Sequence, residues 1–189
     1  ARAVLSDPRV EEVLVMDDFS NQDEWLRLLA LKQESNKYRV ERNEKNVGMS
    51  LNKLRAIQSA KSEWVAILDS DNEINSGYID AMFAAIPWDP NTIYCPEFAA
   101  PNFNYKEFAG LVFDKTNVAS YIDRPLFDCL LNTCNYLVNK AAYAACYVQN
   151  NEVKATDTVW FNYNWLSRGN RMMVVPGATY HHLVHSGSG

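Results

Sequence analysis

The chain has 189 residues, 48% of them hydrophobic and 22% charged, which is typical of a globular protein with one sizeable core. Its formal net charge is −5 and it has no block of Lys and Arg, so we expect no nucleic acid partner. No apolar run is long enough to span a bilayer, and the 4 cysteines form no C-x-x-C pair. We therefore predict free thiols and a cytoplasmic protein, with room for peripheral association at the cytoplasmic face of a membrane.

The first half of the chain alternates short apolar runs with segments of helical spacing. We predict strands at residues 12–16, 38–42 and 64–68, and helices at 21–32, 49–60 and 76–86, the last capped by Ser76 and stopped by Pro87. This order predicts an α/β fold with a central, mostly parallel sheet flanked by helices. In such sheets ligands bind beyond the carboxyl ends of the strands.

The second half is less regular. We predict strands at residues 92–98, 135–138 and 172–175, and helices at 140–147 and 157–168. Residues 101–126 are rich in aromatic, Asn and Asp residues and indicate irregular structure or short helices. Pro176-Gly177 is expected to end the last strand and begin a polar tail. Without a repeat or a linker, residues 1–189 are predicted to form one domain.

Two of the predicted strands deliver aspartates at their carboxyl ends. Asp17-Asp18 follows the first strand, and Asp69-Ser70-Asp71 follows the third. Two carboxylates on one turn suit Mg²⁺ or Mn²⁺, which prefer oxygen ligands and share them with phosphates. An EF-hand beginning at Asp69 also fits in part, but Ile74 stands where that loop needs Gly, and the preceding element is a strand.

Five segments, taken in order, resemble glycosyltransferase family 2. They are VLVMDDFSN at 13–21, NEKNVG at 43–48 followed by Asn52-Lys53, WVAILDSDN at 64–72, Thr156-Asp157, and the stretch from Pro176-Gly177 to His185. The resemblance implies a GT-A fold, with a nucleotide-binding half to about residue 90 and an acceptor-binding half from about residue 91. It also implies an inverting transferase that moves a sugar from a nucleotide-diphosphate donor, such as a UDP-sugar, to a hydroxyl of a carbohydrate or glycoconjugate acceptor.

The resemblance also implies roles for the donor site. Asp18, with Asp17 beside it, matches the aspartate that bonds the nucleotide base; the alternative is a turn aspartate that accepts from backbone amides. Asn46, Gly48 and Asn52 match the loop and helix start beside the nucleotide, where the alternative is a tight helix entry. Asp69, Ser70 and Asp71 match the segment that contacts the ribose, diphosphate and metal. The implied cofactor is Mn²⁺ or Mg²⁺, with Asp71, Asp69 and His182 as its candidate ligands.

Asp157 matches the general base of the family. One carboxylate opposite the leaving group would take the proton of the acceptor hydroxyl, and a single displacement inverts the anomeric centre. The residue before it is usually acidic in the family, whereas here it is Thr156, so a charged helix start capped by Thr156 is the alternative.

The resemblance departs from the family at the start of the domain, where the first, central strand has no counterpart. Two neighbouring strands are then expected to keep an unpaired edge. A sugar nucleotidyltransferase with a related sheet and a non-catalytic binding fragment are the competing interpretations. The sequence does not indicate an oligomeric state.

Overall fold

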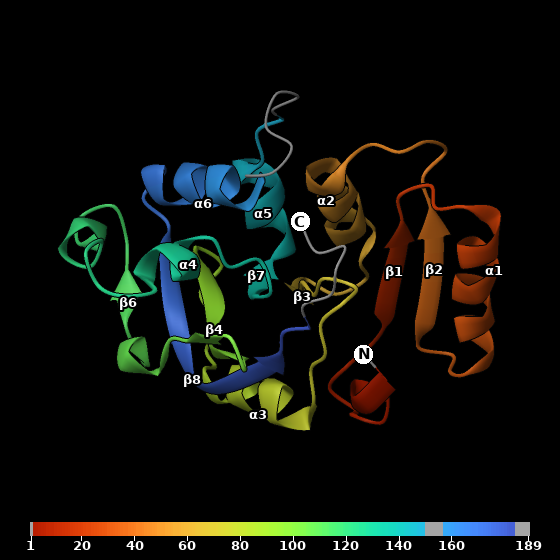
Figure 1. Ribbon diagram of the computed structural model, residues 1–189, viewed down its shortest axis with the longest axis horizontal. Coiled ribbons are helices and arrows are strands. Elements are labelled where there is room, and N and C mark those ends of the chain that lie inside the picture. The colour runs from red at the N-terminus through yellow and green to blue at the C-terminus, as the bar shows by residue number, and fades with distance from the viewer. Residues whose placement is uncertain (1, 150–156, 184–189) are drawn as a thin grey trace.

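The computed structural model describes residues 2–149 and 157–183, which form an α/β fold with two separate sheets (Figure 1). The smaller sheet pairs β1 (Val13–Asp17) with β2 (Tyr38–Arg42) in parallel, from Val13 opposite Tyr38 to Asp17 opposite Arg42. Helix α1 (Gln22–Ala30) connects the two strands as a parallel crossover requires. The first predicted β-α-β unit is therefore confirmed.

The larger sheet has six strands in the order β3-β7-β4-β8-β6, with β5 paired to β4. Their bounds are β3 (Trp64–Ala66), β4 (Thr92–Ala100), β5 (Phe103–Asn104), β6 (Val112–Phe113), β7 (Leu137–Asn139) and β8 (Arg171–His181). Among the described strands of this sheet, only β4 and β8 run parallel, and the other pairs are antiparallel. The prediction of a mostly parallel sheet is wrong for this half: β4 and β5 form a short hairpin, and the other antiparallel pairs, β3–β7, β4–β7 and β6–β8, join segments far apart in the chain.

Four of the remaining helices of the described residues lie close to their predicted places: α2 (Met49–Ser59), α3 (Ser76–Ala84), α5 (Lys140–Cys146) and α6 (Asp157–Ser167). The short helix α4 (Phe127–Leu131) was not predicted, and 3-10 turns lie at Arg2–Val4, Leu31–Gln33, Lys106–Phe108 and Val118–Ser120. The cap of α3 is Asn75, not Ser76, and its side chain accepts from the Tyr78 amide at 3.2 Å. No helix in the described part of the chain is long and apolar enough to cross a bilayer.

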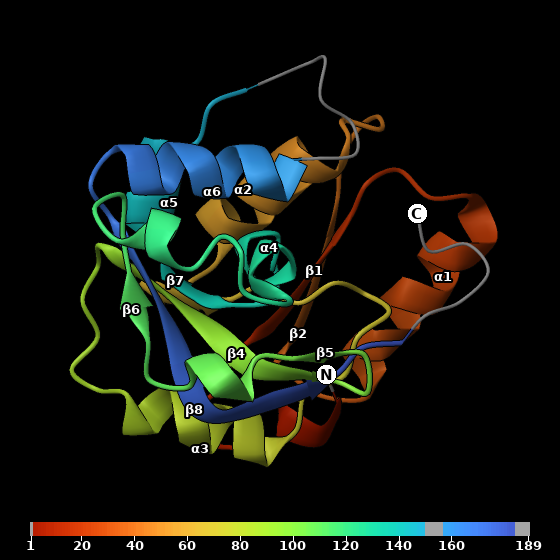
Figure 2. The ribbon, with the colours of Figure 1, turned by 60° about the vertical axis from the view of Figure 1, so that its left-hand side comes forward.

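Alternation along the strands gives the large sheet two apolar faces. Ile93 and Cys95 of β4 join a core with α2, α4, α5 and α6, whereas Tyr94 between them joins a second core with α3. Figure 2 shows α3 on one side of this sheet and α5, α6 and α2 on the other. Helices therefore cover both faces of the sheet.

Strand β8 is longer than predicted. It continues through Pro176-Gly177 to His181, and its register against β4 shifts between Pro96 and Phe98. Pro176 has no amide to donate and Gly177 has a φ of 81°, so this pair forms a bulge inside the strand rather than its end. The extension carries residues 179–181 toward the loop that follows β3.

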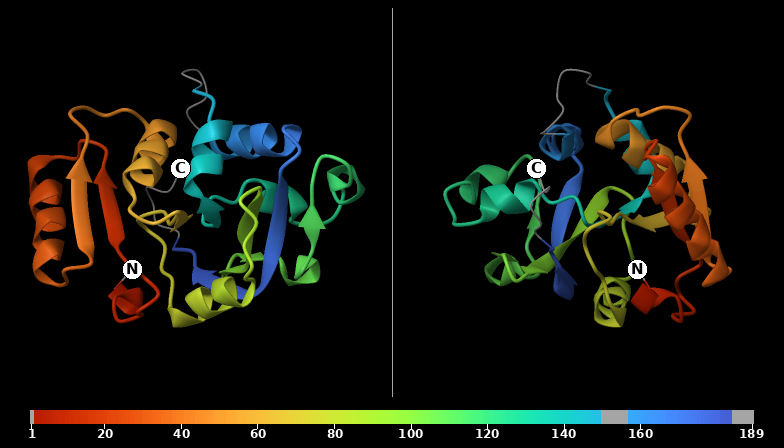
Figure 3. Two further views of the ribbon diagram at one scale, coloured as in Figure 1. Left: turned by 180° about the vertical axis from the view of Figure 1, so that it is seen from behind. Right: turned by 45° about the vertical axis from the view of Figure 1, so that its right-hand side comes forward.

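Within the described residues, β1 pairs only with β2, and β3 pairs only with β7. Each of these strands therefore keeps one edge without a strand partner among the described residues, in agreement with the predicted unpaired edges. Seen from behind, the β1–β2 sheet and α1 stand to one side of the large sheet, with α2 between (Figure 3).

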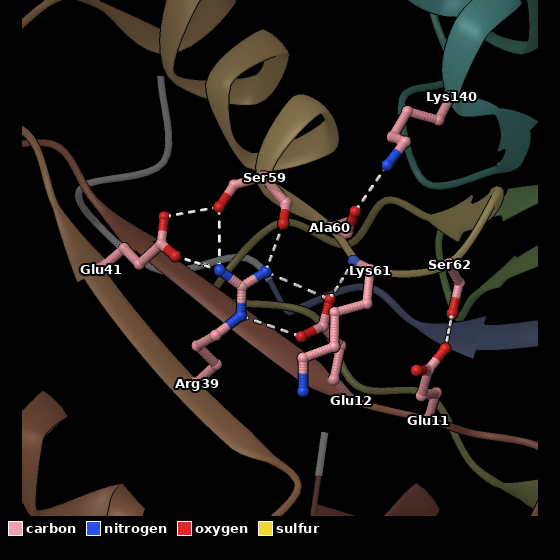
Figure 4. Close-up of polar contacts among 9 residues, drawn as sticks. All are labelled: Glu11, Glu12, Arg39, Glu41, Ser59, Ala60, Lys61, Ser62 and Lys140. Carbon is pink, nitrogen blue, oxygen red and sulfur yellow. Dashed lines mark hydrogen bonds and ion pairs between the residues drawn. The ribbon is translucent and has the colours of Figure 1, made fainter.

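A polar network centred on Arg39 ties the small sheet to the end of α2 (Figure 4). The guanidinium of Arg39 donates to both carboxylate oxygens of Glu12, at 2.9 and 3.2 Å, and to Glu41. It also donates to the hydroxyl and the carbonyl oxygen of Ser59 at the last turn of α2. The amide of Lys61 donates to Glu12 at 2.6 Å, so side chains span the gap that strand pairing leaves.

Candidate functional site

Asp69, Ser70 and Asp71 form a tight turn just beyond β3. The Asn72 amide donates to the Asp69 carbonyl oxygen at 3.0 Å, which closes the turn and places Ser70 and Asp71 at its tip. Ser70 is exposed, whereas the two aspartates are partly buried. The turn therefore presents carboxylates at the end of a strand, where sequence analysis expected them.

The Asp69 carboxylate is contacted from two directions. Cys134 donates its thiol to Oδ2 at 2.8 Å, and Asn135 Nδ2 lies 3.4 Å from the same oxygen. On the other side, Lys53 Nζ of α2 lies 3.5 Å from Oδ1. No role was predicted from the sequence for Lys53, Cys134 or Asn135, and only Lys53 lies in a segment that carries the family resemblance.

The far end of the aspartate turn is fixed by the extension of β8. Glu73 and His181 pair through their backbones, at 3.0 and 2.8 Å, and the Leu183 amide lies 3.3 Å from the Asn72 side-chain oxygen. His182 is thereby brought to the neighbourhood of the turn, with its ring against Phe103 and Tyr180. Its Nδ1 atom is buried and has no hydrogen-bond partner within residues 2–149 and 157–183.

The pKa of the Tyr180 hydroxyl is affected by the charged groups of this region. Burial raises the pKa of its hydroxyl, the Asn135 hydrogen bond lowers it, and the nearby Cys134, Asp69 and Asp71 raise it further. The combined effect keeps Tyr180 neutral as a phenol. Both aspartates of the turn therefore lie close enough to Tyr180 to act on it electrostatically.

Asp17, the last residue of β1, is buried. It forms an ion pair with Arg42 at 3.0 Å and accepts from the Ser20 amide at 3.2 Å. The guanidinium of Arg42 lies 4.9 Å from the Phe19 ring and 5.0 Å from the Trp25 ring, and it donates to the Ser20 carbonyl oxygen. The geometry gives Asp17 a local role in holding the turn after β1; its predicted place beside the nucleotide stays a prediction.

Asp18 holds the loop that leads into α2. Its Oδ1 accepts from Asn43 Nδ2 at 3.0 Å and from the Val47 amide at 2.8 Å, and its Oδ2 accepts from the Gly48 amide at 2.9 Å. Gly48 has a φ of 84°, which favours glycine, and its amide also lies 3.2 Å from the side-chain oxygen of Asn46. These contacts match the turn-aspartate alternative; the predicted base contact of Asp18 stays a prediction.

An open cavity of about 470 Å³ lies along the free edge of β1. It is lined by Val15, Met16, Asp17, Asp18, Ser20, Glu24, Arg27, Leu28, Asn52 and Ser70. Asn52 donates from Nδ2 to the Met16 carbonyl oxygen at 3.1 Å, which satisfies part of that strand edge. The cavity thus brings together residues after two different strands, Asp18 after β1 and Ser70 after β3.

The predicted metal ligands are a carboxylate pair and one imidazole. Within residues 2–149 and 157–183, no three His, Cys, Asp or Glu side chains are gathered as a metal site, so Asp69, Asp71 and His182 are not assembled as a set. Their chemistry nevertheless fits Mn²⁺ or Mg²⁺, because two carboxylates share one turn and phosphate oxygens can complete the shell. The buried Nδ1 atom of His182, which has no partner among the described residues, is a further nitrogen ligand available near the turn.

Asp157 is the first residue of α6, and the residues just before it lie outside the described part of the chain. The α6 helix packs against α2, α5 and β8. Phe161, Trp165 and Leu166 of α6 are packed in the hydrophobic core. Asn162 of the same helix donates to the carbonyl oxygens of Leu131 and Thr133. The role of Asp157 as a base stays a prediction.

These features together define a class of protein. Two sheets with helices on their faces, and a turn of two aspartates beyond a strand, make a GT-A glycosyltransferase fold. The chain belongs to glycosyltransferase family 2, since the model of "Glycosyl transferase family 2" matches residues 2–129.

Known proteins with similar sequences or folds agree with this assignment. Polypeptide N-acetylgalactosaminyltransferase 5 of Caenorhabditis elegans is 35% identical over 92 residues, which is 48% of this chain and 15% of that protein. The structure of GalNAc-T7 with UDP, GalNAc and Mn²⁺ is similar with a TM-score of 0.68 and 17% identity, over 99% of this chain and 41% of that one. The S. aureus TarS 1-349 structure with UDP-GlcNAc has a TM-score of 0.71 and 19% identity, over 99% and 54%. This chain therefore spans about half or less of each of these proteins.

Proposed function

We propose that this domain binds a nucleotide-diphosphate sugar and transfers the sugar to an acceptor hydroxyl with inversion. One observation carries the proposal: a single cavity is lined by Asp18 at the end of β1 and by Ser70 of the aspartate turn after β3. A nucleotide-diphosphate sugar has to contact both places, with its base at one and its diphosphate at the other. Family membership, the UDP and GalNAc named for the GalNAc-T7 structure and the UDP-GlcNAc named for the TarS structure support the same donor class.

The proposed division of labour follows the geometry. Asp69 and Asp71 would hold Mn²⁺ or Mg²⁺, with His182 as a further ligand, and the ion would offset the charge of the departing diphosphate. Asp18, Asn46, Gly48 and Asn52 would line the nucleotide end.

Asp157 would take the proton of the acceptor hydroxyl as that oxygen attacks the anomeric carbon, so the sugar–phosphate bond breaks and the diphosphate leaves. A single displacement with one base inverts the anomeric configuration. The acceptor is proposed as a carbohydrate or glycoconjugate.

Titration calorimetry with UDP, UDP-GlcNAc and UDP-GalNAc, each with and without Mn²⁺, tests the binding half of the proposal. We expect Mn²⁺-dependent binding of at least one of them, weakened at least about tenfold, or about 1.4 kcal/mol, by Asp71→Asn. Asp123→Asn is the matched control, because Asp123 is an exposed carboxylate outside the site. Absence of Mn²⁺-dependent binding to all three compounds would refute the proposal.

Catalysis is tested separately by release of UDP from the bound donor. Asp157→Asn should abolish turnover and leave donor affinity unchanged, since a base acts on the acceptor and not on donor binding. A wild-type chain that binds donor but releases no UDP, with or without simple sugar acceptors, would indicate a binding module instead.

A further inference from the structure

Asp69 is held by a dipeptide that lies 65 and 66 residues further along the chain. We propose that Asn135 and Cys134 are positioning residues that fix the Asp69 carboxylate and, through it, the whole aspartate turn. This inference rests on the proposed function for its consequence in donor binding. The contacts themselves are independent of any ligand.

Asn135 joins three parts of the fold. Its Oδ1 accepts from the Asp69 amide at 2.7 Å, and its Nδ2 contacts Asp69 Oδ2 at 3.4 Å and the Tyr180 hydroxyl at 3.2 Å. The Asp69 amide can only donate, so it fixes which end of the Asn135 amide faces it. Only 3% of Asn135 is exposed, so water cannot replace these bonds at little cost.

Cys134 completes the hold on one carboxylate oxygen. Its thiol donates to Asp69 Oδ2 at 2.8 Å, while Oδ1 faces the ammonium group of Lys53. The two oxygens of Asp69 are therefore distinguished, one engaged by the loop before β7 and the other directed toward α2. Rotation of the carboxylate about its Cβ–Cγ bond would break both contacts.

Fixing Asp69 also fixes Asp71. The turn begins with the Asp69 amide bonded to Asn135 and closes with the Asn72 amide on the Asp69 carbonyl oxygen. Its exit is held by the pairing of Glu73 with His181. A turn clamped at both ends has few alternative arrangements, so the Asp71 carboxylate is preorganised rather than ordered by its ligand.

The test compares two substitutions at each position. Asn135→Ser removes the whole amide, whereas Asn135→Asp keeps an acceptor for the Asp69 amide but replaces the donor with a like charge. Cys134→Ala removes the thiol, and Cys134→Ser keeps a hydroxyl donor. Cys129→Ala is the matched control, because Cys129 is also a partly buried free thiol but lies beside Asp128 in α4.

Two measurements are made on each folded variant. The first is the amide proton shift of Asp69 by nuclear magnetic resonance without ligand, which reports its hydrogen bond to Asn135. The second is the Mn²⁺-dependent affinity for UDP. Removing a residue that hydrogen-bonds a metal-binding carboxylate is expected to lower this affinity about 10- to 100-fold. Thermal melting of each variant shows whether it folds.

We expect Asn135→Ser to move the Asp69 amide signal and weaken UDP binding, and Asn135→Asp to weaken binding while the amide stays hydrogen-bonded. Cys134→Ala should weaken binding, Cys134→Ser should restore it, and Cys129→Ala should change neither quantity. An Asp69 amide unmoved by Asn135→Ser would overturn the inference whether or not the wild type binds UDP. Wild-type binding that survives all four substitutions would also overturn it and leave the proposed function standing.

Discussion

Removing the guanidinium of Arg39 tests how the small sheet is attached to the rest of the fold. Arg39→Met keeps an unbranched stem but deletes every polar contact that the Arg39 guanidinium makes in Figure 4. The lost bonds run to Glu12 before β1, to Glu41 on β2 and to Ser59 at the end of α2. Since no strand pairing joins β1 to β3 within the described residues, this network is a main polar link across the gap.

The expected loss follows from the exposure of each partner. The Glu12 side chain is 8% exposed and that of Arg39 is 27% exposed, so their bidentate pair is partly shielded from water. Hydrogen bonds between charged groups contribute about 1.5–3 kcal/mol, whereas the more exposed pair with Glu41 adds about 0–1 kcal/mol. Glu12 keeps the Lys61 amide as a partner, which limits the penalty. We expect a loss of about 2–3 kcal/mol, or a Tm lowered by about 4–12 °C for a chain of this size.

Urea unfolding at pH 7, followed by circular dichroism, measures this loss. The control is Arg124→Met, because Arg124 and Glu107 form a pair whose side chains are 55% and 40% exposed, and its loss should cost less than about 1 kcal/mol. Combining Arg39→Met with Glu12→Gln should cost less than the sum of the single changes, since no charge is then left unpaired. An Arg39→Met variant no less stable than Arg124→Met would show that the network does not hold the two sheets together.

Three further predictions concern pH, backbone strain and the loop before α2. Burial raises the pKa of Glu12, but its hydrogen bonds to Arg39 and to the Lys61 amide lower this pKa on balance. The contribution of Glu12 to stability is therefore complete above the ordinary pKa of about 4.3 and is lost as pH falls through the lowered pKa of the folded state. Between about pH 5 and 3, the urea midpoint should fall more steeply with decreasing pH in the wild type than in Arg39→Met. Phe19 has a φ of 68°, and Phe19→Gly should be more stable than Phe19→Ala by about 1 kcal/mol in thermal unfolding, since both lose the ring but only Gly relieves the strain. The Cβ atom added by Gly48→Ala would meet no atom within 4 Å, but alanine is strained at the φ of 84° found there. We expect the free energy of unfolding to fall by about 1–3 kcal/mol and the residue 48 amide, which donates to Asp18, to be displaced. Unchanged stability would contradict this prediction.

Local pattern was enough to predict most elements of the fold. The strand at Tyr38–Arg42 and the start of α2 at Met49 match their predicted residues, because apolar spacing and a preceding glycine specify them locally. The strand through Pro176-Gly177 was missed, since the same dipeptide that ends a strand elsewhere forms a bulge when a long partner strand continues beside it. The mixed strand pairing was missed for a related reason, because pairing partners depend on contacts between distant segments.

In the candidate site, too, local pattern predicted some features, whereas others depend on contacts between distant segments. Asp69 and Asp71 stand where a β-α-β pattern places ligand-binding residues, so their location followed from chain order alone. The partners of Asp69 could not be predicted in this way, since Cys134 and Asn135 reach it from before β7, and Asn135 is bonded in turn to Tyr180 of β8. A cysteine and an asparagine before a short strand carry no local signal of that role. Only the three-dimensional pairing of β3 with β7 shows it.

The contacts of Asp18 show that its two interpretations are compatible. A carboxylate offers about four acceptor positions, and three are used by Asn43 and by the amides of Val47 and Gly48. In the described part of the chain Oδ2 accepts only from Gly48, so one position is left for an N–H donor such as that of a nucleotide base. Because the same carboxylate holds the loop, anything that displaces Gly48 would also turn the remaining acceptor. Base binding and loop conformation are therefore expected to be lost together and not separately.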